Sequence, residues 1–338
     1  TEVYRYTLTN EQGVSASFTN FGAIWLTMSV PDKNGQFDDV ILGYDSVDSI
    51  QTQPGHPGEP VGRNANRIGG AKFTLNGVTY ELAKNSAEVN NLHSGPDYYR
   101  DRIWDAEVEE TALGTTITFG LHSPDGDQGY PGNADITVSY TLTPDNCLKL
   151  DYHMVSDADT IANFTNHVYF NLGGYKSGSA LDQKVWIDAD YFTATDANSI
   201  PTGELVAVKG TPMDFTEMKP IGRDIQEDYQ ALKYGNGYDH NWALNHPAGE
   251  LSLSAKAEDE KTGRTMEVYT DLPGVQFYTA NSLKTERGKN HAVYTPRCGY
   301  CFETQYFPDA INQPEFASPV IKAGEEYKTT TIYKFGVK

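Results

Sequence analysis

The sequence predicts an all-β protein, a large antiparallel β-sandwich with few short helices, and three observations carry this prediction. Aromatic residues make up 12% of the 338 residues, with 22 Tyr and 14 Phe, and such residues favour the half-buried faces of pleated sheets. Several segments alternate apolar and polar side chains with the period of a strand. Turn clusters rich in the 31 Gly and 17 Pro recur along the chain, which suits many strands joined by loops.

The individual strands follow this alternation. Residues 14–18 place apolar side chains at every second position. Residues 136–142 and 148–154 do the same on either side of a Pro-Asp-Asn turn, which predicts an antiparallel hairpin. Residues 251–268, with a central turn, and the C-terminal run 329–335 repeat the pattern. These segments are expected to form the body of the sheets.

Helical periodicity is scarce. Its best case runs from Gly222 to Tyr234, where Ile225, Tyr229 and Leu232 fall at i, i+4 and i+7, and this spacing predicts one surface helix. No Pro/Gly/Ser-rich linker, charge block or fixed-period repeat divides the chain. We therefore expect a single domain over residues 1–338.

The charge balance argues against nucleic acid and membrane partners. The chain has 26 Lys and Arg against 46 Asp and Glu, a net charge of -20, whereas binding to phosphate backbones or anionic lipid depends on clustered cations. No apolar stretch approaches the ~18 residues of a spanning helix, and the N-terminal region lacks the pattern of a secretory leader. We expect a cytoplasmic protein.

Cofactor and metal motifs have little support. Cys298 and Cys301 have CxxC spacing, which could mark a redox pair or half a zinc site, but the second ligand pair and the βαβ context are missing. A structural role is favoured for both. Residues 125–129 resemble the opening of a calcium loop without its later ligands. With no phosphate-binding glycine loop or hydrolase elbow either, we expect no cofactor and no metal ion.

Two polar residues stand out within strand-like runs. His167 lies between aromatic and Asn neighbours, where a lone histidine is more often a satisfied interior residue than a functional one. Glu303 shares a pleat face with Cys301 and Gln305. Burying a carboxylate is costly unless it is paired or functional; the alternative is a strand-end residue that faces water.

Three glycine-flanked segments, expected as loops, complete the candidates. They are residues 62–69, 90–95 and 237–242, and each holds Arg, His, Asp or Asn side chains. Such donors and acceptors suit a ligand with several hydroxyl groups, and nearby aromatic faces suit the C–H surface of a sugar ring. Taken singly, polar loops of this kind are ordinary.

The motifs together closely resemble the aldose 1-epimerase (galactose mutarotase) family. They appear in the family's order, and the resemblance covers essentially the whole chain. The motifs are GRNANRIGG, NNLHSG, TNHVYFNL, GYDHNW, GVQFYTAN and CFETQYFPDAIN. The resemblance implies a β-sandwich with a sugar site in an open cleft, and an enzyme that interconverts the α and β anomers of free aldoses such as galactose or glucose. It implies a small-molecule sugar as the partner and no cofactor.

Site roles follow from the resemblance, residue by residue. Glu303 would be the general base and His167 the general acid. His93 would be a second site histidine that hydrogen bonds near the ring oxygen. The other matched residues would bind the substrate: Arg67, Asn66 and Asp239 by holding hydroxyls, and Gln276 by lining the cleft.

Three residues depart from the family pattern. Ser94 stands where the family usually has Gly, which puts the pose of His93 in question. His56 and Glu59 lie in a segment where family members more often carry Tyr or Ala-like residues. Because that segment is expected to border the cleft, substrate preference could differ from galactose.

Two other functions stay open at the level of sequence. A glycosidase could use Glu303 with Asp239 as its carboxylate pair, which requires carboxylates ~5 to 9.5 Å apart. A non-catalytic carbohydrate-binding protein would need the hydroxyl-binding residues but not the pairing of Glu303 with His167. Neutral sugars are favoured, since no strong cationic cluster for a phosphosugar is evident. The preferred sugar and the choice between monomer and homodimer are not determined.

Overall fold

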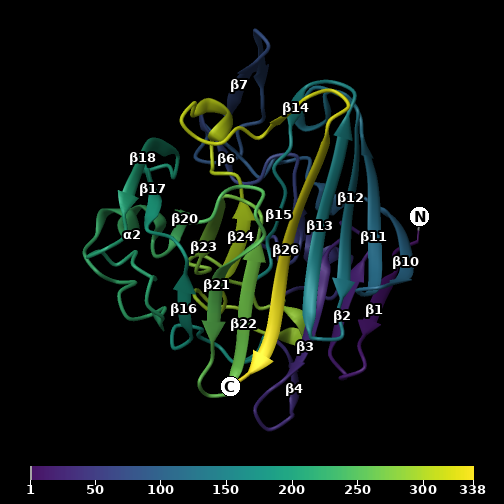
Figure 1. The fold of residues 1–338 in the computed structure, drawn as a ribbon, viewed down its shortest axis with the longest axis vertical. Helices are drawn as coiled ribbons and strands as arrows, with labels where there is room; N and C mark the ends of the chain where they lie inside the picture. Colours follow the sequence, from purple (N-terminus) through teal and green to yellow (C-terminus); the bar gives the residue numbers. More distant parts are fainter. Residues whose placement is uncertain (1) are drawn as a thin grey trace.

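The computed structural model describes residues 2–338 and consists mainly of antiparallel strands (Figure 1). A nine-stranded sheet has the order β10-β11-β12-β13-β26-β22-β21-β16-β19, a five-stranded sheet has the order β18-β17-β20-β23-β24, and the N-terminal strands form a four-stranded sheet. Four two-stranded ladders complete the described part of the chain. The predicted all-β sandwich class is confirmed.

The nine-stranded sheet contains β10 (Asp105–Thr111), β11 (Gly114–Ser123), β12 (Ala134–Leu142), β13 (Cys147–Ser156), β26 (Glu326–Val337), β22 (Arg264–Thr270), β21 (Ser252–Glu258), β16 (Lys184–Ile187) and β19 (Lys219–Pro220). The five-stranded sheet contains β18 (Pro201–Ala207), β17 (Tyr191–Thr195), β20 (Asp239–Ala243), β23 (Gly274–Tyr278) and β24 (Cys301–Gln305). The N-terminal sheet contains β1 (Arg5–Thr9), β2 (Ser15–Thr19), β3 (Trp25–Pro31) and β4 (Phe37–Asp39). The ladders pair β5 (Pro60–Val61) with β15 (Thr165–Asn166), β6 (Arg67–Ile68) with β9 (Asn91–Leu92), β7 (Lys72–Leu75) with β8 (Val78–Glu81), and β14 (Thr160–Ile161) with β25 (Val320–Ile321).

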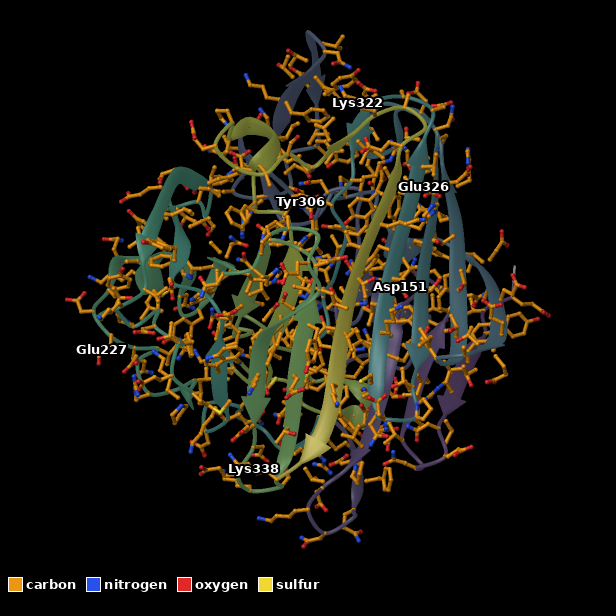
Figure 2. All side chains as sticks on the ribbon, in the orientation of Figure 1. Asp151, Glu227, Tyr306, Lys322, Glu326 and Lys338 are labelled. Atoms are coloured by element: carbon orange, nitrogen blue, oxygen red, sulfur yellow. The ribbon has the colours of Figure 1, made fainter. Side chains whose placement is uncertain are left out.

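The predicted hairpin is confirmed as β12 and β13. Their register pairs Ile136 with Met154 and Leu142 with Leu148, and all four side chains are buried in the core. The intervening positions of β13 are partly exposed, so the sheet has one apolar and one solvated face. Asp151 and Glu326 lie on that solvated face (Figure 2), where their charged side chains remain hydrated.

The predicted helix at 222–234 is mostly wrong. The structure has two short helices among residues 2–338, α1 (Val47–Thr52) and α2 (Gln230–Gly235), and residues 221–228 are turns. Ile225 and Leu232 are buried as the pattern requires. However, the Gly222 N–H donates to Leu181 O at 2.8 Å, so this backbone is held by a neighbouring segment and not by a helical ladder. Neither helix has the length or the apolar character to cross a membrane.

Aromatic side chains join the layers. Trp25 of β3 packs against Phe170 and against Tyr333 of β26, with ring centroids 5.9 and 5.7 Å apart. All three side chains belong to the largest buried cluster. The high aromatic content is thus used to bury large areas between the N-terminal sheet and the nine-stranded sheet.

Candidate active site

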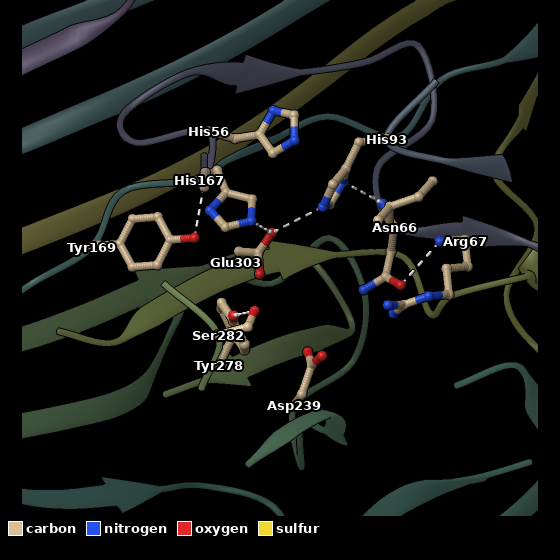
Figure 3. Close-up of a pocket in the computed structure, with 12 residues that line it drawn as sticks. His56, Asn66, Arg67, His93, His167, Tyr169, Asp239, Tyr278, Ser282 and Glu303 are labelled. Carbon is tan, nitrogen blue, oxygen red and sulfur yellow. Dashed lines mark hydrogen bonds and ion pairs between the residues drawn. The ribbon is translucent and has the colours of Figure 1, made fainter. Parts of the chain in front are cut away.

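A cavity of about 250 Å³ collects most of the residues that the sequence singled out (Figure 3). It is bounded by segments that are far apart in the chain. The lining residues are Gly55, His56, Asn66, Arg67, Leu92, His93, His167, Tyr169, Asp239, Tyr278, Ser282 and Glu303.

The alternation of side-chain direction along β24 places Glu303 in this cavity. The side chains of Phe302 and Thr304 face the nine-stranded sheet: Phe302 belongs to the core cluster that includes Tyr333, and Thr304 Oγ1 lies 2.6 Å from Thr331 Oγ1. Because neighbouring side chains of a strand point to opposite faces, Glu303 points away from the core of the sandwich. The expectation of a shared face with Cys301 and Gln305 is confirmed.

Glu303 is buried between two histidines. Its Oε1 lies 3.6 Å from Nε2 of His167 and 4.0 Å from Nε2 of His93, and this buried oxygen has no hydrogen-bond partner within residues 2–338. Burial raises the pKa of Glu303 well above its ordinary value; the negative charge of Asp239 adds to the rise and Arg67 opposes it. The strand-end alternative, in which Glu303 faces water, is thereby excluded.

His167 follows β15 and is fixed from several sides. Its backbone N–H donates to Glu59 O at 2.9 Å, and its ring packs against Tyr169 with centroids 5.1 Å apart. Nδ1 lies 3.6 Å from Sγ of Cys301, whose pKa burial raises well above its ordinary value. Burial lowers the pKa of His167 to about 3. This histidine is therefore held neutral, with Nε2 turned to Glu303.

His93 is locked to Asn66 in one tautomer. The backbone N–H of Asn66 donates to the ring Nδ1 of His93 at 3.0 Å, and the backbone N–H of His93 donates to the backbone carbonyl of Asn66 at 2.9 Å. A backbone amide can only donate, so Nδ1 is unprotonated and Nε2 carries the hydrogen. Burial, followed by the charges of His167 and His56, lowers the pKa of His93 well below its ordinary value. His93 thus offers a neutral N–H donor to the cavity.

The same three side chains have the residue types of a metal site. Ligand atoms of His93, His167 and Glu303 all lie within 4.8 Å of one another. Metal ligation by His93 would need a lone pair on Nε2, but the contact from Asn66 to Nδ1 places the hydrogen there. The trio therefore presents a hydrogen-bond donor where a metal ion would need a ligand.

A hydrogen-bond chain supports the far side of the cavity. Asn66 Nδ2 donates to Gln305 Oε1 at 3.3 Å, Gln305 Nε2 to Gln276 Oε1 at 3.1 Å, and Gln276 Nε2 to Asp239 Oδ1 at 2.9 Å. Gln276, which was expected to line the cleft, is not among the lining residues; both ends of its amide bond to Gln305 and Asp239. Gln305 and Asn241, which also bonds Gln305, were not assigned roles from sequence; their period-two spacing with Glu303 and Asp239 is the signal that could have found them.

Arg67 and Asp239 approach the cavity from different elements. Arg67 lies in β6, and its Nε has no hydrogen-bond partner within residues 2–338. Asp239 begins β20, although residues 237–242 were expected as a loop. The reason is that this segment pairs with β23, from Asp239 opposite Tyr278 to Ala243 opposite Gly274. Both side chains line the cavity.

Some polar residues of the singled-out motifs serve the framework instead. Arg63 is fully buried and donates to the carbonyls of Ser123, Pro131 and Gly132, among others. Ser94, the departure beside His93, has a buried hydroxyl that accepts from Asn64 N–H at 3.0 Å and donates to Asn64 O at 2.9 Å. It thereby ties the segment of His93 to that of Asn66. Cys147, Cys298 and Cys301 are buried free thiols.

Comparisons with known proteins agree over the whole chain. The sequence profile of the family described as aldose 1-epimerase matches residues 4–334. Galactose mutarotase of Bos taurus is 40% identical over 337 residues, which cover 99% of this chain and 94% of the relative. Aldose 1-epimerase of Escherichia coli K12 is 34% identical over 331 residues, with 97% and 94% covered.

Solved structures of aldose epimerases superpose on nearly the whole chain. An aldose epimerase homologue from C. elegans superposes with a TM-score of 0.90 at 26% identity, covering 99% of both chains. Galactose 1-epimerase from Lactobacillus acidophilus gives a TM-score of 0.86 at 26% identity, covering 99% of this chain and 98% of the other.

Proposed function

The chain belongs to the aldose 1-epimerase family and is an isomerase that interconverts α and β anomers, and from this premise we propose which residues carry the reaction and which sugars it accepts. Glu303 is the general base and His167 the general acid. Arg67 and Asp239 hold sugar hydroxyls, and His93 donates from Nε2 near the ring oxygen. The observation that carries this assignment is the approach of both imidazole Nε2 atoms to one buried carboxylate oxygen.

Anomer exchange requires opening of a cyclic hemiacetal. Glu303 takes the proton of the C1 hydroxyl while His167 gives a proton to the ring oxygen, so the C1–O5 bond breaks and C1 becomes an aldehyde. After rotation about C1–C2, the C5 hydroxyl attacks the opposite face of the aldehyde. His167 takes back the hydroxyl proton and Glu303 returns its proton to O1. Protons and electrons balance without a redox partner.

The environment strengthens each group in its role. A carboxylate whose pKa is raised is a stronger base, and an imidazolium whose pKa is lowered is a stronger acid. The pair needs one proton in total, placed on His167 at the start of the cycle. Hydroxyl donors of the bound sugar, together with Arg67, stabilise the ionised form of Glu303 and so favour this placement. Ring opening then returns both groups to the neutral forms that burial favours.

The cavity suits one neutral sugar ring. Its volume of about 250 Å³ falls below the ~300–1,000 Å³ typical of sites for drug-sized ligands, which favours a monosaccharide over a disaccharide. Arg67 is the permanent cation of the lining, beside two carboxylates, Asp239 and Glu303. A phosphorylated sugar would face those carboxylates, so free galactose or glucose is the proposed substrate.

Polarimetry tests the proposal directly. Freshly dissolved α-galactose or α-glucose should reach its equilibrium rotation faster in proportion to added enzyme, above the spontaneous rate. A parallel assay with a chromogenic galactoside should show no cleavage. Sugar binding without acceleration, or cleavage of the glycoside, would replace this proposal by one of the two alternative functions.

A further inference from the structure

A third histidine faces the cavity and has no part in the proposed proton transfers. His56 lines the cavity, with ring centroids 5.7 Å from His167 and 5.8 Å from His93. Figure 3 shows it at the opposite end of the site from Asp239, with Glu303 between them. A ring bound at Glu303 therefore has His56 on one side and Asp239 on the other.

A buried carboxylate fixes the orientation and tautomer of this imidazole. Nδ1 of His56 lies 2.6 Å from Oε1 of Glu59, a residue that is only 2% exposed. Arg100 Nη1, which can only donate, also lies 3.1 Å from this Nδ1, but the contact with the carboxylate oxygen is the shorter one and places the hydrogen on Nδ1. In that tautomer the lone pair of the imidazole is on Nε2. Arg100 places Nη1 3.5 Å from the other oxygen of Glu59 and keeps this buried charge compensated. Nε2 has no hydrogen-bond partner within residues 2–338.

The segment that carries His56 is pinned at both ends. Gly55 O accepts from Tyr169 Oη at 2.6 Å, while Gly58 O accepts from the side chain of Asn166 at 3.0 Å. Gly58 has φ +74°, and a Cβ there would lie 2.0 Å from Trp25 O, so only glycine fits. His56 itself has φ +61°, which is uncommon outside glycine. The ring is thus held in place before any ligand arrives, which reduces the ordering cost of binding.

We propose that His56 is a further substrate-contacting, specificity-determining residue, whose Nε2 accepts a hydrogen bond from a sugar hydroxyl other than that on C1, with Glu59 as its positioning residue. The inference rests on the proposed function and names a polar contact beyond those with Arg67 and Asp239. A site that bonds a particular hydroxyl discriminates against the analogue that lacks it, because its own acceptor is then left unpaired.

Two substitutions separate this role from a structural one. In His56→Asn the amide can still donate to Glu59 but nothing replaces Nε2. In His56→Gln the longer amide can present its oxygen near the position of Nε2. The kcat/KM of each variant is measured for the parent sugar and for its 2-, 3-, 4- and 6-deoxy analogues, with thermal melting followed by circular dichroism to verify folding.

The expected result is a selective loss. The wild-type enzyme should prefer the parent sugar over one deoxy analogue by about tenfold or more. His56→Asn should lose that preference and leave kcat/KM for this analogue unchanged, whereas His56→Gln should keep part of it. His122→Asn is the matched control, since His122 also contacts a carboxylate, that of Asp135 at 2.8 Å, but its side chain is 61% exposed on β11. It should behave as wild type.

The inference is overturned if His56→Asn keeps the wild-type preference for every hydroxyl, or if both variants lose activity equally on all sugars. Failure of the proposed function gives a different result, namely no acceleration by the wild-type enzyme on any sugar. In that case affinities of the same deoxy series, measured by calorimetry for wild type and both variants, decide the role of His56 by the same selective loss.

Discussion

Nε2 of His167 lies 3.6 Å from Oε1 of Glu303, and that oxygen has no hydrogen-bond partner within residues 2–338. An unpaired buried carboxylate oxygen is costly, so its presence marks a place where a ligand group completes the contacts. The gap also leaves both atoms free to reach different oxygens of one sugar.

The first prediction concerns turnover. Glu303→Gln and His167→Asn should each lower kcat by about 10²- to 10⁴-fold, because each removes a proton-transfer group while keeping a similar shape. Polarimetry on fresh α-sugar measures the effect. Glu326→Gln and His153→Asn are matched controls, since these residues form a surface Glu–His contact at 3.2 Å. Near-normal mutarotation in either site variant would refute the assignment.

The second prediction concerns pH. The active pair of Glu303 and His167 holds one proton, and activity is lost in acid when a second proton binds. Because the pKa of His167 is lowered to about 3, that loss should lie far below the ordinary histidine value of 6.5. Hence kcat/KM, corrected for the spontaneous reaction, should show no acid-side loss as the pH falls from 7 to 5. A one-proton decline centred near pH 6.5 would contradict the proposed state of the free enzyme.

The third prediction concerns substrate positioning. Arg67→Ala and Asp239→Ala should raise KM at least as strongly as they lower kcat. Gln276→Leu should produce a weaker effect in the same direction, because it frees Asp239 from the 2.9 Å contact that orients it. Steady-state kinetics over a range of galactose concentrations measures both constants. Unchanged constants in the two Ala variants would remove those residues from the site.

The fourth prediction concerns stability. Folding raises the pKa of Glu303 above its unfolded value. Its contribution to the free energy of unfolding is therefore fully present below the unfolded pKa, and it is lost as the pH rises through the folded pKa. Glu303→Gln has no such loss and should therefore be more stable than wild type at pH 8, by about 1–2 kcal/mol. The gain should shrink toward pH 4.5. Denaturant unfolding at the two pH values measures it; an equal difference at both would exclude burial of the charge as the cause.

Local pattern predicted several of the strands correctly, but the helix that it predicted at 222–234 is mostly turns. Alternation sufficed for β12 and β13 because a strand with one solvated face repeats every two residues. At 222–234 the spacing of Ile225, Tyr229 and Leu232 was right for burial, yet the chain follows turns that are bonded to Leu181. Similarly, Asp239 was expected in a loop, and pairing with β23 made it part of a strand. In both cases contacts with distant segments overrode the local signal.

The sequence by itself determined the strand-rich class, the shared face of Glu303 and Gln305, and the set of motifs by which the family is identified. Those properties depend on residue order and on the fixed period of a strand. Only the tertiary structure decided that His93 and His167 approach one carboxylate, that His93 keeps its hydrogen on Nε2, and that Glu59 orients His56. These depend on how sheets and loops pack. Burial and neighbouring charge, which shift the pKa values of the site, exist only once distant segments have come together.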